Sequence, residues 1–491
     1  MILRELMRGI ETLRVEGSME VGISGISYDS RKTAEGDLFA AVRGESSDGH
    51  DFIGKAVEKG AVAVMHQGPA VMRRGAEGRE VTYIQVADSR ESLAGVANNF
   101  YGRPSARLQV IGVTGTNGKT TTTYLIKSIL EEWGKKTGLI GTIQYLVGHE
   151  VHEATHTTPE APEFQHLLHE MLLAGCTHVV SEVSSHALAQ KRVDGTVFST
   201  AVFTNLTRDH LDFHETMEEY FLAKDRLFSS LLSKEGMAVI NCDDEYGRRL
   251  WNDCGRGYTY GLGPGADLRA EDIVNSPVGL RFRLVFRDSS HPVESSLIGQ
   301  HNVYNILAAA GAGLAAGIPV GTVLRGIRMA GNVKGRFERI DAGQPFIAVI
   351  DYAHTEDALE RTLLTARQLT RGRVITVFGC GGDRDRGKRP RMGEVAARLS
   401  DLVIITSDNP RSERPEDIIR DIEAGARGGH YVIEPDRTEA IRRAVKESRE
   451  GDLLLVAGKG HEEYQEMGGR RCQYSDREVL QETIRRFVLN T

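Results

Sequence analysis

Short apolar runs alternate with longer amphipathic stretches along most of the chain. Between residues 108 and 333, strand-like runs at 109–113, 177–183, 196–204 and 237–240 are separated by segments with helical spacing. Such alternation predicts a mostly parallel sheet. Ligands bind at the carboxyl ends of the strands in sheets of this kind, so the residues that follow each apolar run are the first candidates for a functional site.

The regions on either side show the same alternation. Residues 1–107 hold short strand-like runs and a helical pattern at 52–58, and residues 101–105 form a linker that contains glycine and proline. The chain is also too long for a single core, and about three domains are expected. We therefore predict an α/β fold with three domains: a small N-terminal α/β domain (1–107), a central P-loop-type ATPase domain with a mostly parallel sheet (108–333), and a C-terminal Rossmann-like α/β domain (334–491).

A glycine-rich turn follows the first strand of the central region, at residues 110–123, Val-Ile-Gly-Val-Thr-Gly-Thr-Asn-Gly-Lys-Thr-Thr-Thr-Thr. Gly115 and Gly118 allow backbone N–H groups to close on an anion, Lys119 supplies charge for the terminal phosphates, and the Thr120 hydroxyl can bind Mg²⁺. The usual P-loop pattern has glycine where this chain has Val113, and a structural turn is the alternative.

Two residues near other strand ends, and one on a predicted helix, are candidates for chemistry beside the phosphates. Glu182 and His210 could hold a metal there, although hydrogen-bonded loop residues are the alternative. Lys224 falls on the apolar stripe of a helix predicted at 218–232, four residues after Tyr220. It is either a lysine whose ammonium reaches solvent from the rim of the core, or a buried lysine held neutral or converted to a carbamate.

The second half of the chain adds polar groups of both charge signs. Asn302 and Asn305 precede a helix predicted at 306–316 and could present amides to a purine, or Asn302 could cap the helix. Three further strands end in Arg384, in Asp408-Asn409-Pro410-Arg411 and in Glu462. Solvated loops are the alternative, but both charge signs at strand ends suit a zwitterionic ligand.

Composition excludes several classes of protein. The net charge of −7 and pI of about 6.2 give no global reason to expect nucleic-acid binding. No apolar run approaches the roughly 20 residues that span a bilayer, and the N-terminus does not resemble a signal peptide, so a cytoplasmic protein without membrane insertion is expected. The five cysteines lack zinc-finger spacing and are expected to be buried thiols.

Six motifs resemble the Mur ligases of peptidoglycan synthesis over nearly the whole chain. They are Thr114-Gly-Thr-Asn-Gly-Lys-Thr, Glu182-Val-Ser-Ser-His, Thr204-Asn-Leu-Thr-Arg-Asp-His-Leu-Asp-Phe-His, His301-Asn-x-x-Asn305, Gly335-Arg-x-Glu and Asp351-Tyr-Ala-His. That family lacks the first P-loop glycine. The loop Asp29-Ser-Arg31, His156-Thr-Thr-Pro159 and Asp408-Asn-Pro-Arg411 are similar to its MurE branch, whereas Glu356 replaces a proline that is usual in the family.

The resemblance implies an ATP-dependent ligase that uses Mg²⁺ and joins meso-2,6-diaminopimelate to the D-Glu of UDP-MurNAc-L-Ala-D-Glu through an acyl phosphate. The Asp-Asn-Pro-Arg form is associated with diaminopimelate. A monomer without nucleic-acid partners is expected. The alternatives are the same ligase using L-lysine, a folylpolyglutamate synthase-like amide ligase, and a non-catalytic nucleotide-binding switch.

The resemblance also assigns residues. The nucleotide is expected at Gly115, Thr116, Asn117, Gly118, Lys119, Thr120, Thr121, Asn302, Asn305, Arg336 and Asp351. UDP-MurNAc-dipeptide is expected at Tyr28, Ser30, Glu45, Ser46, Ser47, His156, Thr157, Thr158, Ser184, Gln190 and Arg192. Diaminopimelate is expected at Arg384, Asp408, Asn409, Pro410, Arg411, Gly458 and Glu462. Mg²⁺ is expected at Thr120, Glu182, His210 and Lys224 as carbamate, and the catalytic residues are Lys119, Lys224, His210 and Glu182.

Overall fold

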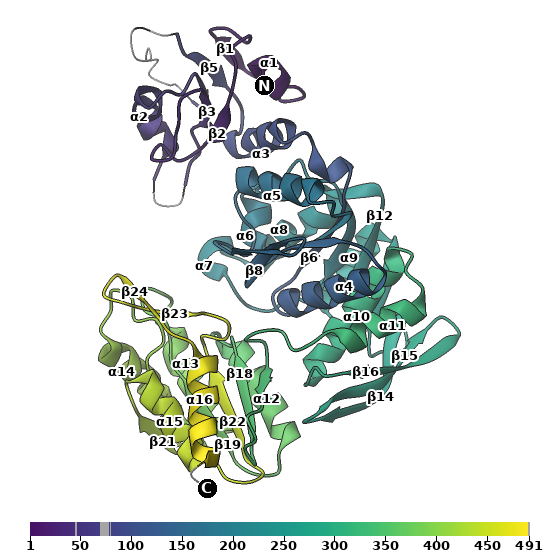
Figure 1. The fold of residues 1–491 in the computed structure, drawn as a ribbon, viewed down its shortest axis with the longest axis vertical. Helices are drawn as coiled ribbons and strands as arrows, with labels where there is room; N and C mark the ends of the chain where they lie inside the picture. The colour runs from purple at the N-terminus through teal and green to yellow at the C-terminus, as the bar shows by residue number, and fades with distance from the viewer. Residues whose placement is uncertain (45–46, 69–77, 79, 490–491) are drawn as a thin grey trace. The chain divides into compact units, whose positions relative to one another are not determined.

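The computed structural model describes residues 1–44, 47–68, 78 and 80–489 (Figure 1). The chain divides into two compact units, Met1–Ala266 with Ala308–Gly326, and Asp267–Leu307 with Ile327–Thr491. Glu45 and Ser46, which were predicted to bind the UDP end, lie outside the described residues. Every helix in the described part of the chain is too short or too polar to cross a membrane.

The first unit begins with a five-stranded sheet in the order β1-β5-β4-β3-β2. Neighbouring strands from β2 to β5 run parallel, and β1 pairs antiparallel with β5 at the edge. The strands are β1 (Arg14–Glu16), β2 (Gly25–Ser27), β3 (Asp37–Ala40), β4 (Ala63–His66) and β5 (Thr82–Gln85), and the helices are α1 (Leu3–Leu6), α2 (Ile53–Glu58) and α3 (Ser89–Phe100). Helix α3 begins at Ser89 because the Asp88 carboxylate accepts hydrogen bonds from the backbone N–H groups of Arg90 and Glu91.

The same unit contains the central sheet, with strand order β13-β12-β11-β6-β10-β7-β8-β9. The strands from β7 to β13 in this order run parallel, whereas β8 and β9 are antiparallel additions. The strands are β6 (Gln109–Thr114), β7 (Thr137–Ile140), β8 (Gln144–Val147), β9 (Glu150–Glu153), β10 (His178–Glu182), β11 (Phe198–Phe203), β12 (Leu232–Asn241) and β13 (Gly257–Gly261). The helices are α4 (Lys119–Glu132), α5 (Ala161–Leu173), α6 (Ser185–Ala189), α7 (Leu211–His214), α8 (Met217–Ser229) and α9 (Glu245–Cys254).

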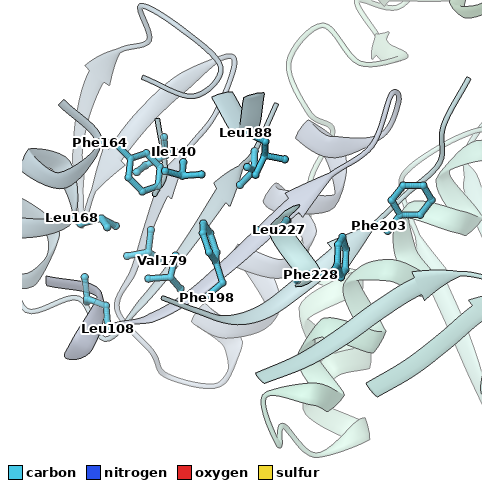
Figure 2. Packing of buried hydrophobic residues seen from close by; sticks show 14 of the residues in the cluster. Leu108, Ile140, Phe164, Leu168, Val179, Leu188, Phe198, Phe203, Leu227 and Phe228 are labelled. Carbon is cyan, nitrogen blue, oxygen red and sulfur yellow. The ribbon is translucent and has the colours of Figure 1, made fainter. Parts of the chain in front are cut away.

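A continuous apolar core supports the central sheet. It includes Ile140, Phe164, Val179, Phe198 and Leu227, and each of these side chains is completely buried. Figure 2 shows part of this core. Apolar burial is the main favourable term in folding, so this packing fixes the positions of the strands of the central sheet and of the residues at their ends.

The second unit contains a six-stranded sheet in the order β17-β18-β22-β19-β20-β21. Strand β17 is an antiparallel edge strand, and the others run parallel. The strands are β17 (Glu338–Ile340), β18 (Ile347–Asp351), β19 (Val374–Phe378), β20 (Leu402–Ile405), β21 (Tyr431–Ile433) and β22 (Leu453–Ala457). The helices are α12 (Glu356–Leu369), α13 (Lys388–Leu399), α14 (Pro415–Ala426), α15 (Arg437–Glu447) and α16 (Asp476–Leu489).

Two antiparallel groups complete this unit. They are β14 (Leu268–Ser276), β15 (Gly279–Phe286) and β16 (Ser289–Ser295), and the hairpin of β23 (Tyr464–Met467) and β24 (Arg470–Gln473). Helices α10 (Gln300–Ala315) and α11 (Val320–Met329) have residues in both units. The predicted fold class is confirmed, whereas the domain boundaries at residues 107 and 333 stay predictions.

Two predicted helices have different bounds in the structure. The helix predicted at 218–232 ends at Ser229, and Leu232 already belongs to β12, so Leu231 is not part of the helical stripe. The helix predicted at 306–316 begins at Gln300, because Asn302 and Asn305 bond within its first turns instead of preceding it. At α8 the apolar pattern continues past the end of the helix. At α10 the apolar pattern begins only after the helix has started.

Candidate active site

The glycine-rich turn joins β6 to α4 as predicted. Gly115 and Gly118 have φ angles of 143° and 85°, which favour glycine, and a Cβ on Gly115 would lie 1.9 Å from Thr204 Oγ1. Lys119 Nζ donates to the carbonyl oxygens of Gly115 and Thr116 at 3.0 and 2.9 Å. The lysine therefore lies against the turn, at the N-terminus of α4, where anions are stabilised.

Two residues that were not assigned a role brace this turn. The Asn205 carbonyl accepts from the Thr116 N–H at 2.8 Å, and Asn205 Oδ1 accepts from the Asn117 N–H at 3.0 Å. Thr204 Oγ1 donates to the Asn117 carbonyl at 2.7 Å. Both follow β11, in the motif Thr204-Asn-Leu-Thr.

Thr120 and Glu182, two of the predicted metal ligands, lie in direct contact. Thr120 Oγ1 donates to Glu182 Oε2 at 3.0 Å, and both side chains are buried. Thr142, which the sequence did not suggest, donates to the same carboxylate from its backbone N–H and its hydroxyl at 2.9 and 3.0 Å. A carboxylate beside hydroxyl oxygens is the donor set that Mg²⁺ prefers, so these residues fit the predicted ion.

Lys224 is buried, with an exposed fraction of 1%. Its Nζ donates to the Gly115 carbonyl at 2.9 Å and lies 4.5 Å from the centre of the Tyr220 ring. Among the described residues, no carboxylate forms an ion pair with it. Burial, followed by the charge of Lys119, places the pKa of Lys224 well below its usual value although Asp209 opposes this. The alternative that the ammonium of Lys224 reaches solvent from the rim of the core is therefore wrong.

The imidazole of His210 lies near the same lysines. Partial burial is the largest cause that lowers its pKa to about 4; Asp209 opposes this effect, and His186, Lys119 and Lys224 add to it. The ring centre lies 4.7 Å from that of His186. A neutral imidazole is the form that binds metals.

The residues predicted to bind the dipeptide form one connected network around the end of β10. Thr158 Oγ1 donates to the Glu182 carbonyl at 2.9 Å and accepts from the Ser184 N–H at 3.1 Å. Arg192 donates to the Thr158 carbonyl and to Gln190 Oε1 at 3.0 and 2.7 Å. Thr157 and Thr142 hydroxyls lie 3.0 Å apart. The network therefore reaches the same carboxylate that Thr120 contacts.

The residues predicted for the UDP end, and His156, do not form a connected hydrogen-bond network among the described residues. The Tyr28 hydroxyl donates to Glu163 Oε1 of α5 at 2.8 Å. In this structure the hydroxyl proton is therefore used within the protein. Ser30 is buried, whereas Ser47 and His156 are exposed. No hydrogen bond in the described residues joins Ser47 to Tyr28 or Ser30.

In the second unit, Asn302 and Asn305 share a buried face of α10. Asn302 Nδ2 donates to the Ile298 carbonyl, and Asn305 Nδ2 donates to Asn302 Oδ1, both at 2.8 Å. The guanidinium carbon of Arg336 lies 4.8 Å from the centre of the Tyr352 ring. The Asp351 carboxylate accepts from the N–H groups of Phe337 and Ala353, at 2.7 and 2.8 Å, and burial raises its pKa.

The strand ends of the C-terminal sheet bring charges of both signs together. A Cβ on Gly458, after β22, would lie 2.6 Å from Asp408 Oδ2, after β20, so glycine allows these two strand ends to approach. Arg411 has a φ of 54°, donates from Nη1 to the Gly382 carbonyl at 2.6 Å, and lies 3.8 Å from Glu466 Oε2. Arg384 is exposed and donates to the Asp383 carbonyl.

A buried ion pair that the sequence did not indicate stabilises the same edge. Arg437 and Asp476 are completely buried and make two hydrogen bonds of 2.7 Å. The guanidinium also donates to the carbonyls of Ser407 and Ala457, which precede Asp408 and Gly458. No local pattern marks this pair, because its members lie 39 residues apart.

Three family models match: "Mur ligase family, catalytic domain" at residues 22–101, "Mur ligase middle domain" at 113–313, and "Mur ligase, glutamate ligase domain" at 335–460. Together they match most of the chain between residues 22 and 460.

Full-length relatives agree with these matches. The chain is 50% identical over 469 residues to a UDP-N-acetylmuramoyl-L-alanyl-D-glutamate--2,6-diaminopimelate ligase of Solibacter usitatus, covering 95% of this chain and 94% of that one. It is 45% identical over 489 residues to a ligase with the same name, numbered 1, of Clostridium acetobutylicum, covering 99% of both chains. A solved structure of such a ligase superposes with a TM-score of 0.70 at 33% identity and 99% coverage of both chains. With this identity extending from the first domain to the last, the chain belongs to the Mur ligase family.

Proposed function

We propose that this chain is the ATP-dependent ligase that joins meso-2,6-diaminopimelate to the D-Glu of UDP-MurNAc-L-Ala-D-Glu, the reaction for which its relatives are named. The observation that carries the proposal is the group of strand ends after β20 and β22, where Asp408 and Glu462 act on one another and Arg411 follows in the same loop as Asp408. An amino acid with two amino groups and two carboxylates needs a site of both signs.

A free carboxylate is a poor acyl donor, so the reaction needs ATP. The D-Glu carboxylate attacks the γ-phosphorus, the bond to ADP breaks, and an acyl phosphate forms. Lys119 and the N–H groups of the glycine-rich turn stabilise the charge on the transferred oxygens. The amine of diaminopimelate then attacks the acyl carbon, and the tetrahedral intermediate expels phosphate to leave the amide. No protein nucleophile is required.

We propose Mg²⁺ as the metal of this reaction. Thr120, Glu182 and His210 would hold it, with Lys224 as carbamate. When bound, the ion neutralises charge on the phosphate oxygens. The neutral amine of Lys224 is the form that adds to CO₂: the N–C bond forms, one proton is released, and the product is an anionic carbamate.

Selectivity for diaminopimelate over L-lysine is proposed to depend on Arg411. Its guanidinium can pair with the second carboxylate of diaminopimelate, which L-lysine lacks. A site built for a polar group rejects an analogue without it, because its own polar groups are left unpaired. Asp408 and Glu462 are the groups that suit the second ammonium.

The experiment that tests the function is phosphate release from ATP and Mg²⁺ with UDP-MurNAc-L-Ala-D-Glu, comparing meso-diaminopimelate, L-lysine and no amino acid. Release that depends on diaminopimelate is expected. Equal release with L-lysine would remove the selectivity argument and keep the ligase. Release that ignores the amino acid would favour the nucleotide switch, and dependence on a folate acceptor would favour the folylpolyglutamate synthase-like alternative.

A matched pair of variants sharpens this experiment. Arg411→Met is expected to raise the KM for diaminopimelate about 10- to 100-fold and to leave the KM for ATP unchanged. Arg443→Met is the control, because Arg443 is an exposed arginine of the same sheet region. We further propose that the enzyme is cytoplasmic, since its substrates are ATP and a UDP-linked precursor. We also propose that it is a monomer, and sedimentation would check this oligomeric state.

A further inference from the structure

We propose that Lys459 is a positioning residue: its buried ammonium, together with the Asn409 amide, fixes the Glu462 carboxylate in the orientation that receives the second ammonium of the incoming amino acid. This inference rests on the proposed function and adds a residue to it. Lys459 lies directly after Gly458, and no role was predicted for it from the sequence.

The ammonium of Lys459 makes two hydrogen bonds within the protein. The residue is completely buried, and its Nζ donates to Asn409 Oδ1 at 2.9 Å and to Glu462 Oε2 at 3.2 Å. Asn409 Nδ2 donates to the same Glu462 oxygen at 2.8 Å. The lysine, the amide and the carboxylate thus form a closed triangle that links the loop after β20 to the loop after β22.

The triangle leaves Asn409 little freedom to bind a ligand through its oxygen. Asn409 Oδ1 accepts from Lys459 and, at 3.0 Å, from the backbone N–H of Glu466. Both hydrogen bonds on the Glu462 carboxylate fall on Oε2 in the described residues, which leaves Oε1 as its unshared acceptor. We therefore assign Asn409 an orienting role and Glu462 Oε1 the contact with the ligand.

The charges around the triangle suit an ammonium. Burial is the largest cause that raises the pKa of Glu462; Lys459 opposes this effect, and Asp408 adds to it. Two carboxylates and one fixed ammonium leave one negative charge, which a single ammonium of the ligand would neutralise. Without Lys459, two carboxylates would share a buried site, and burial of like charges is unfavourable.

The test uses the full-length enzyme and compares diaminopimelate with 2-aminopimelate, which lacks the second amino group. The wild type is expected to prefer diaminopimelate in kcat/KM. Lys459→Gln is expected to reduce this preference by about tenfold or more, through the KM for diaminopimelate, with the KM for ATP unchanged. Lys459→Arg keeps the charge and is expected to give a preference between these two values. Lys446→Met, at an exposed lysine of the same unit, is the control.

A double variant separates positioning from general support of the fold. If Lys459 acts through Glu462, then Lys459→Gln has little further effect on the preference in a Glu462→Gln background. Equal rises in the KM values for all three substrates, or a wild-type preference in every variant that folds, would overturn the proposal. A wild type that uses no diaminopimelate would instead refute the proposed function.

Discussion

Lys224 and Lys459 are both buried lysines, and their surroundings differ in one respect. The ammonium of Lys459 contacts a carboxylate, that of Glu462, and an amide oxygen. Lys224 contacts the Gly115 carbonyl and the Tyr220 ring, and in the described residues no ion pair reaches it. Lys459 thus donates to a carboxylate, whereas Lys224 donates to a backbone carbonyl, and Asp209 acts on it without forming an ion pair in the described residues.

This difference separates two uses of a buried lysine. Burial disfavours the charged form of an amine, and an adjacent carboxylate offsets that effect. A lysine that donates to a carboxylate keeps a negative partner for its ammonium, whereas burial lowers the pKa of Lys224, which favours the amine form that can react with CO₂. The comparison therefore predicts that the groups beside a buried basic side chain, and not burial alone, determine its contribution to stability and its reactivity.

The largest expected effect concerns the buried guanidinium of Arg437, which resembles Lys459 in being paired. Arg437→Met leaves the Asp476 carboxylate buried without a partner, so the free energy of unfolding should fall by about 3–5 kcal/mol. Urea unfolding measures it. Replacing Asp476 as well, in Arg437→Met/Asp476→Leu, should recover much of the loss. No measurable change is expected for Arg486→Met, which breaks an exposed pair with Glu482.

Lys224→Met tests the unpaired lysine. The variant lacks the amine and therefore cannot form the carbamate. The value of kcat should fall about 100- to 1000-fold, and a higher amino-acid concentration should not restore it. NMR of enzyme incubated with ¹³C-bicarbonate should show a carbamate signal in the wild type and none in the variant. Lys234→Met, at an exposed lysine, should keep both. Activity within tenfold of the wild type would contradict the carbamate.

His178 extends the comparison to an imidazole. Burial, followed by the charge of Lys135, lowers its pKa from 6.5 to about 4. Between pH 6.5 and 4 the unfolded chain binds a proton that the folded chain does not, so stability falls as the pH is lowered through this window. The contribution is about 3 kcal/mol.

The variant His178→Gln should therefore lose less stability than the wild type between pH 6.5 and 4, as measured by urea unfolding at each pH. His149→Gln, at an exposed histidine, should follow the wild type. Identical pH dependence for His178→Gln and the wild type would mean that His178 has the same pKa in the folded and the unfolded chain.

The smallest expected effect concerns the ring that Lys224 lies against. The Tyr220 hydroxyl lies 3.1 Å from Thr116 Oγ1 in the glycine-rich turn. Tyr220→Phe keeps the ring and removes this hydrogen bond, so the KM for ATP should rise about fivefold, which corresponds to about 1 kcal/mol. Tyr246→Phe should leave the KM unchanged. An unchanged KM in Tyr220→Phe would show that the hydroxyl does not orient the turn.

The sequence alone predicted the α/β class, the parallel strands and the glycine-rich turn, because their signals are local. Apolar spacing marks a strand or helix, and Gly115, Gly118 and Lys119 stand within one short segment. The same locality explains the errors, since the ends of α8 and α10 depend on hydrogen bonds that apolar spacing does not report.

Only the tertiary structure decided which charges meet. Lys459 and Asn409 lie 50 residues apart, and Thr142 and Glu182 lie 40 apart. A charged residue looks the same in the sequence whether it faces a carboxylate, a carbonyl or water, yet its free energy of burial differs by several kcal/mol among these cases. The roles of Lys224 and Lys459 therefore became distinct only when folding placed Glu462 beside one of them and not beside the other.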